Sequence, residues 1–162
     1  MNWLILNKKP VFKPVIMKNN IAIKLILFFA VFGIIVSVYA LAHHFELAGG
    51  EFCSISDALD CDKVNKSVYS EIFGVPVALL GIIFYVSVFS LALIKFLRPV
   101  IDATEDFYQK ALFYLSAVGL LFTLYLNFVE AFLIKSFCLV CLMSFLAVIG
   151  IFATVFIGSE DN

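Results

Sequence analysis

The sequence predicts an all-α fold, namely an integral membrane four-helix bundle with an extracytoplasmic loop that contains a short amphipathic helix. The first observation behind this prediction is composition. Of the 162 residues, 64% are hydrophobic and 14% are charged, whereas a soluble domain is about half apolar and about a quarter charged. The second is that several apolar runs reach roughly 20 residues, the length that crosses a bilayer. Together they indicate one membrane domain.

The apolar runs set the expected boundaries. The expected parts are a cytoplasmic tail over 1–20, a membrane domain over 21–158 and a cytoplasmic tail over 159–162. Within the domain, the predicted segments are helices over about 21–42, 75–97, 108–132 and 138–157 and a periplasmic loop over 43–74. Pro76 suits the first turn of the second helix, because its missing N–H has no helical partner to lose there.

The loop over 43–74 holds two of the four cysteines, Cys53 and Cys61. Cys61, Val64 and Val68 are spaced i, i+3 and i+7, which predicts one apolar face of a short helix. Cys61 should therefore look toward the bundle. Cys53 follows two glycines and is expected on a looser part of the loop.

The basic residues predict the orientation of the chain. With the N-terminus inside, those at or near the cytoplasm are Lys8, Lys9, Lys13, Lys18, Lys24, Lys95, Arg98 and Lys110. Those left outside are Lys63, Lys66 and Lys135. The positive-inside rule therefore places both termini in the cytoplasm and all the cysteines on the outer face. A net charge of -1 argues against nucleic acid as a partner, and the apolar spans make membrane lipid the expected surroundings.

The strongest chemical signal is the segment KSFCLVCLMSF, where Cys138 and Cys141 open the last span. Residues at i and i+3 share one helix face, so the two thiols can bond to each other. The partial positive charge of a helix N-terminus favours the thiolate, the form that attacks disulfides. With Cys53 and Cys61 on a movable loop, the two pairs suit a relay that moves electrons from thiols outside the bilayer to an acceptor dissolved within it.

Three other interpretations of the cysteines stay open at this point. Two structural disulfides are possible, although a bridge within C-x-x-C constrains little of the chain. A four-thiolate zinc site would need closer ligands than Cys53 and Cys61, which lie eight positions apart. Unrelated intracellular thiols would require the opposite topology, against the distribution of basic residues.

Over about residues 39–145, the chain resembles the vitamin K epoxide reductase family, and within it the prokaryotic members that lack a fused thioredoxin domain. The residues that carry the resemblance are Cys53, Cys61, Ser67, the segment FGVPVALLGIIFY from Phe73 to Tyr85 and the segment YLNFVEAFLIKSFCLVC from Tyr125 to Cys141. The resemblance implies a four-helix bundle around a quinone, with loop cysteines that take electrons from a thioredoxin-fold partner.

Position by position, the resemblance implies a role for each cysteine. Cys53 matches the cysteine that meets the partner, and Cys61 matches the one that attacks Cys138. Cys141 matches the cysteine that reacts with the quinone. Ser67 matches a loop hydroxyl near the quinone, with a solvated or helix-capping serine as the alternative.

The chain departs from the family pattern at two positions. Vertebrate members have an asparagine where Val77 stands and a tyrosine where Phe145 stands, and both residues hydrogen-bond vitamin K. Phe145 is kept as a candidate quinone contact, but the contacts of this protein must differ. Epoxide reduction is the activity that this difference puts in question.

Polar residues near the outer ends of spans are further candidates. Asn127 and Glu130 lie three apart on one helix face, where they could contact or protonate a quinone. The alternative for Glu130 is a carboxylate that reaches the interface or pairs with Lys135. His43 and His44 are expected to face headgroups or water, with a proton-relay or quinone-contact role as the alternative.

The function expected from these observations is reoxidation of an extracytoplasmic thioredoxin-fold, DsbA-like protein at a bacterial plasma (inner) membrane. Electrons would pass through Cys53 and Cys61 to Cys138 and Cys141, and then to ubiquinone or menaquinone. Reduction of vitamin K or its epoxide is the alternative within the same class. A non-enzymatic membrane protein with structural disulfides is the alternative from another class.

Overall fold

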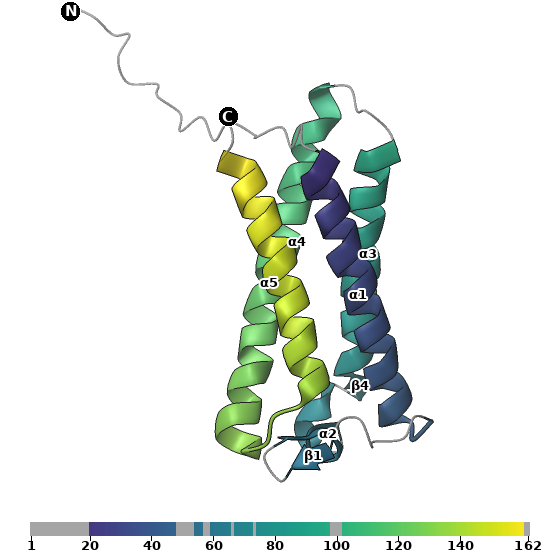
Figure 1. Cartoon of the computed structure of the whole chain (residues 1–162), viewed down its shortest axis with the longest axis vertical. Helices are drawn as coiled ribbons and strands as arrows, with labels where there is room; N and C mark the ends of the chain where they lie inside the picture. The colour runs from purple at the N-terminus through teal and green to yellow at the C-terminus, as the bar shows by residue number, and fades with distance from the viewer. Residues whose placement is uncertain are drawn as a thin grey trace, which may run out of the picture.

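The computed structural model describes residues 20–47, 54–56, 59–65, 67–72, 74–97 and 102–160. Its long helices are α1 (Asn20–His44), α3 (Val77–Leu97), α4 (Asp102–Val129) and α5 (Leu139–Glu160). They run side by side in one bundle (Figure 1). All four are long and apolar enough to cross a membrane. The predicted all-α membrane bundle is therefore confirmed.

The helices form a closed ring in which α1 packs against α3 and α5, and α4 packs against α5 and α3. The other elements are β1 (Ser54–Ser56), β2 (Leu59–Asp60), α2 (Cys61–Asn65), the 3-10 helix η2 (Val68–Ser70), β3 (Glu71–Ile72) and β4 (Val75–Pro76). Figure 1 shows β1, α2 and β4 at one end of the bundle, where α4 also ends and α5 begins. The loop after α1 thus meets the connection between α4 and α5.

The short strands make two small antiparallel pairs that the sequence did not reveal. Ser54 lies opposite Asp60 in the first pair, and Glu71 lies opposite Pro76 in the second. The second pair brings the chain back to the start of α3, next to the end of α1. These pairs hold α2 between the ends of the long helices.

Helix α1 continues to His44, two residues beyond the predicted end at 42. The N–H of Leu47 donates to the carbonyl oxygen of Ala42 at 2.9 Å, and the N–H of Glu46 donates to that of His43 at 3.1 Å. Glu46 has a φ of 59°, so these bonds form a Schellman cap with a glutamate in the place that glycine usually takes. The cap satisfies the last carbonyl groups of α1 and turns the chain into the loop.

Helix α4 begins at Asp102, six residues before the predicted start at 108. Its first turns carry acidic side chains, which favour a helix N-terminus but hide it from a search for apolar runs. At its other end, α4 continues into a π-helical turn, η3 (Glu130–Ile134), which Lys135 closes with a φ of 56°. This turn carries the helix two residues past the predicted end at 132 and sets the direction of Glu130.

Close contacts between small and aromatic residues hold the bundle together. Lipid tails are as apolar as leucine, so helix association in a bilayer depends on tight packing rather than on escape from water. Gly33 of α1 lies against the ring of Tyr85 of α3, where an added methyl group would overlap the ring. Tyr85 in turn is buried in the core beside Val88 and Val148.

Replacing Gly33 by alanine should destabilise the bundle by about 1–3 kcal/mol, the usual cost of overpacking. The added methyl group would push Tyr85 out of its place between α1 and α5. The measurement is the midpoint of thermal unfolding in detergent. Ile35→Ala is the control, because Ile35 lies on the same helix and is exposed. Equal midpoints for the two variants would contradict this packing.

Candidate redox site

The centre of the site is a contact between two sulfur atoms from distant parts of the chain. The Sγ of Cys138 lies 3.1 Å from the Sγ of Cys61, and both residues are only 1% exposed. Cys61 is disulfide-bonded, whereas Cys138 and Cys141 are free thiols. Cys53 lies outside the described residues. A free thiol next to a bonded sulfur is the arrangement from which thiol–disulfide exchange begins.

Helix α2 presents Cys61 because its apolar face packs on the start of α5. Cys61 and Val64 are buried together with Cys138, and Ile134, Leu139 and Val140 pack around them. Cys61 and Val64 thus share the apolar face that their spacing predicts. Val68 belongs to η2 rather than to α2, so the predicted short helix ends before it.

Cys138 stands immediately before α5 and takes part in capping it. Its carbonyl oxygen accepts the N–H of Leu142 at 3.0 Å, and its own N–H donates to Oε2 of Glu130 at 3.1 Å. A hydrogen bond with the Cys141 side chain is the main cause that lowers the pKa of the Cys138 thiol. The N–H groups of Cys141 and Val140 also lower it, whereas burial and the charge of Glu130 oppose the shift. Cys138 is therefore the readier thiolate.

This pKa predicts how Cys138 ionises with pH. A lowered pKa means that Cys138 becomes a thiolate at a lower pH than an ordinary thiol, and that the thiolate is lost as the pH falls through the lowered value. Its ultraviolet absorbance should therefore titrate below the ordinary thiol pKa of about 8.5. Cys141→Ser weakens the largest cause of the shift and should move the titration to higher pH. A titration at or above the ordinary value would contradict the prediction.

An apolar cavity of about 310 Å³ lies in the half of the bundle next to this contact. Its wall includes Val77 and Phe84 of α3, Phe122 of α4 and Cys141 of α5. Cavities of roughly 300–1,000 Å³ with apolar walls and a few polar groups are typical of small-molecule sites. The dimensions and lining suit the flat ring of a quinone, with the Cys141 thiol in the wall.

Three of the four predicted quinone-binding candidates line this cavity, and one does not. Ser67, Asn127 and Glu130 all contribute to its wall. Phe145 is half-buried and lies outside the lining. The reason is helical geometry, because Cys141, Ser144 and Val148 form the lining face of α5 and Phe145 lies to one side of it. Phe145 is thus not placed as a cavity contact.

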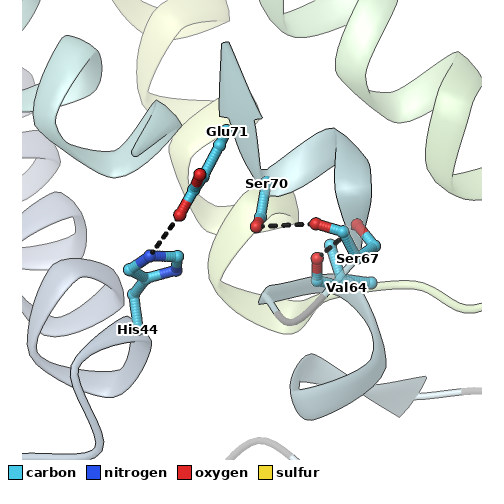
Figure 2. A network of polar contacts seen from close by, with 5 residues as sticks. All are labelled: His44, Val64, Ser67, Ser70 and Glu71. Atoms are coloured by element: carbon cyan, nitrogen blue, oxygen red, sulfur yellow. Dashed lines mark hydrogen bonds and ion pairs between the residues drawn. The ribbon is translucent and has the colours of Figure 1, made fainter. Parts of the chain in front are cut away.

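The two serines of the loop make local bonds, which Figure 2 shows. The Oγ of Ser67 donates to the carbonyl oxygen of Val64 at 2.7 Å, and the Oγ of Ser70 donates to that of Ser67 at 2.8 Å. Ser67 therefore bonds back to the end of α2 and also lines the cavity, but its side chain makes no capping bond to η2. The Asn127 amide likewise donates within its own helix, to the carbonyl oxygen of Thr123 at 2.8 Å.

The two histidines at the end of α1 are largely covered by protein, whereas they were expected to face headgroups or water. His43 is buried. His44 lines the cavity, and its Nε2 lies 3.3 Å from Oε1 of Glu71 on β3 (Figure 2). The cap at Glu46 ends α1 directly after these histidines. His44 thus joins the end of α1 to the loop at the edge of the cavity.

Tyr85 is a cavity residue to which sequence reasoning gave no role. Its hydroxyl donates to the carbonyl oxygen of Ser144 at 2.9 Å and lies 2.8 Å from the Ser144 Oγ. It therefore supplies a fixed phenol close to the position of Phe145. The sequence did offer a signal for this residue, namely a tyrosine hydroxyl inside an apolar span. A buried tyrosine usually needs a polar partner.

No metal site accompanies the thiols in the part of the chain that the structure describes. Those residues contain no group of three or more His, Cys, Asp or Glu placed to hold a metal ion. The buried sulfur atoms contact each other instead.

The bundle, the sulfur contact and the apolar cavity together define a class of protein, the multi-pass membrane oxidoreductases that work through cysteine thiols. A model of the vitamin K epoxide reductase family matches residues 24–156, and the chain belongs to this family. The resemblance noted in the sequence is thus confirmed at the level of the family. Members of this family are oxidoreductases, which favours an enzyme over the non-enzymatic alternative. No curated protein sequence matches the chain.

Proposed function

We propose that this protein reoxidises an extracytoplasmic thioredoxin-fold, DsbA-like protein and passes the electrons to a membrane quinone. The observation that carries the proposal is the sulfur contact of 3.1 Å between Cys61 and Cys138. It joins the loop that would meet a soluble partner to the wall of an apolar cavity. In this proposal the protein is of the prokaryotic, DsbB-like type.

The proposed route conserves electrons and protons. The partner dithiol reduces the disulfide between Cys53 and Cys61 and becomes a disulfide itself. Cys61 then attacks Cys138 in the disulfide between Cys138 and Cys141, and Cys53 resolves the mixed disulfide by attacking Cys61. Cys138 and Cys141 are now the dithiol. They return to the disulfide by giving two electrons and two protons to the quinone, which becomes the quinol.

The thiol states seen in the structure fit one stage of this route. Cys61 is disulfide-bonded while Cys138 and Cys141 are free. This is the stage after electrons have moved to the inner pair and before they leave it. The free Cys141 thiol faces the cavity at this stage.

The direction of flow follows from reduction potentials. DsbA-type partners have potentials near about -120 mV, so only a strongly oxidising acceptor can keep them oxidised. For two electrons, each 30 mV between donor and acceptor is worth about 1.4 kcal/mol. A respiratory quinone, ubiquinone or menaquinone, meets this requirement.

The same proposal includes a location. We place the chain in a bacterial plasma membrane with both termini in the cytoplasm and the cysteines outside, because the basic residues favour that orientation. The end of the bundle that carries α2 would then face the oxidising compartment, where thiol oxidation is needed.

The test combines trapping with turnover. A Cys61→Ala variant leaves Cys53 as a thiol without its own pair, so Cys53 should attack the disulfide of an oxidised thioredoxin-fold partner and hold it as a mixed disulfide, with one partner thiol released. Purified native protein should oxidise that partner when ubiquinone or menaquinone is added, at the rate at which quinone absorbance falls. Failure to oxidise any thioredoxin-fold dithiol with either quinone would contradict the proposal. Preference for vitamin K epoxide would favour the alternative within the family.

A further inference from the structure

Glu130 is the one acidic side chain at the site among the described residues, and it contacts both inner cysteines. It is 2% exposed. Its Oε2 accepts the N–H of Cys138 at 3.1 Å, and the side chain of Cys141 lies close enough to interact with the same carboxyl group. It also lines the apolar cavity together with Cys141. A single carboxyl group therefore links the backbone of one thiol, the sulfur of the other and the space that would receive the electrons.

The chain is shaped so that this carboxyl group points inward. Glu130 begins the π-helical turn at the end of α4, and the N–H of Ser136 donates to its carbonyl oxygen at 3.3 Å. Lys135, the alternative partner considered from the sequence, is exposed beyond the turn. Such π-helical turns occur often at functional sites. A buried carboxyl group is expensive to keep in an apolar bundle, which suggests a use beyond capping.

Capping alone does not require an acid. The N–H of Cys138 needs only an oxygen acceptor, and a glutamine amide would supply one of nearly the same shape. A carboxylate can do one thing more, which is to take up a proton and release it again. The neighbouring thiol of Cys141 is the group with a proton to give.

We propose that Glu130 is a catalytic residue that carries the proton of Cys141 to the electron acceptor in the cavity. This inference rests on the proposed function and assigns the proton path of its last step. The S–H proton of Cys141 moves to the Glu130 carboxylate as the sulfur gives up its electrons, and Glu130 then releases that proton to an oxygen atom of the quinone.

The electrons and protons of this step balance if water accepts one proton and supplies another. A bond forms between the sulfurs of Cys138 and Cys141, and the two electrons released reduce the quinone to the quinol. One of the two protons taken up comes from Cys141 through Glu130. Cys138 reacts as the thiolate, so its proton has already been released to water, and water supplies the second one.

The other titratable groups near the cavity do not replace Glu130 in this role. Tyr85 of α3 is bonded to Ser144, and His44 of α1 is paired with Glu71 at the loop. Cys61 of α2 is already disulfide-bonded. Among the described groups, Glu130 is the one that both interacts with the Cys141 side chain and lies in the cavity wall.

The experiment compares Glu130→Gln with the native protein in a single turnover. Fully reduced protein is mixed with ubiquinone, and the loss of quinone absorbance is followed. The loss of a positioned acid–base group costs about 100-fold or more, so the glutamine variant should be slowed by about that factor. Its thermal stability should match the native protein, because glutamine keeps the bond to Cys138. A glutamine variant that reduces ubiquinone at the native rate would overturn the proposal.

A second readout needs no quinone. The charge of Glu130 raises the pKa of the Cys138 thiol, so Glu130→Gln should move the thiolate titration of Cys138 to lower pH. An unchanged titration would show that Glu130 carries no charge to accept a proton and would overturn the proposal. Glu160→Gln is the matched control, because it removes a carboxyl group at the far end of α5 and should alter neither measurement. If native protein itself fails to reduce quinone, the proposed function has failed rather than the role of Glu130.

Discussion

Replacing Cys141 by serine should leave a folded protein whose quinone reduction is slower by at least about 10³-fold, a loss typical of removing a reacting group. Cys141 is the inner thiol that lines the apolar cavity. Cys138 is covered by α2 and contacts Cys61 instead. No other described thiol could take over the transfer to an acceptor in the cavity. The measurement is the steady-state loss of quinone absorbance with a reduced thioredoxin-fold partner.

The serine substitution removes one sulfur atom and keeps the side chain small, so the fold should persist. Thermal unfolding in detergent checks this point. Ser116→Ala serves as a control, since it removes a buried hydroxyl from the middle of α4, far along the chain from either cysteine pair. Near-native quinone reduction by Cys141→Ser would mean that Cys141 is a structural residue.

Replacing Cys61 by serine should separate the two halves of the route. Multiple turnover with the partner should fall by at least about 10³-fold, because Cys61 is the described loop sulfur that reaches Cys138. A single turnover should survive, because protein reduced beforehand still holds electrons on Cys138 and Cys141. Both quantities come from one stopped-flow experiment that counts quinone molecules reduced per protein.

The Cys61→Ser variant can be compared directly with Cys141→Ser in the same experiment. Cys141→Ser should lose both the single and the multiple turnovers, whereas Cys61→Ser should lose only the latter. If Cys61→Ser continued to turn over with the partner, electrons would be reaching Cys138 without the contact seen in the structure.

Much of the fold could be predicted because a bilayer imposes simple rules. Apolar runs of the required length mark the spans, and α3 and α5 begin within two residues of their predicted starts. The ends that differ are those governed by polar chemistry. Asp102 begins α4 in a charged stretch, and the cap at Glu46 ends α1. Hydropathy carries no information about the start of α4 or the end of α1.

The cavity could be predicted only in part. The spacing of Cys61 and Val64 gave the face of α2, but the approach of Cys61 to Cys138 was implied by the family resemblance rather than by spacing. Strands of two or three residues are too short to show a period. The direction of Glu130 depends on a π-helical turn, and the place of Phe145 depends on which face of α5 turns inward. These features arise from tertiary packing, which local sequence patterns do not report.

The central claim is that Cys61 and Cys138 exchange electrons directly. A Cys53→Ser, Cys141→Ser double variant leaves these two as the remaining cysteines, so mild oxidation followed by peptide mapping without reductant tests the claim. We expect a nearly complete disulfide between Cys61 and Cys138 within one chain. Two free thiols, or disulfides formed only between separate chains, would contradict it.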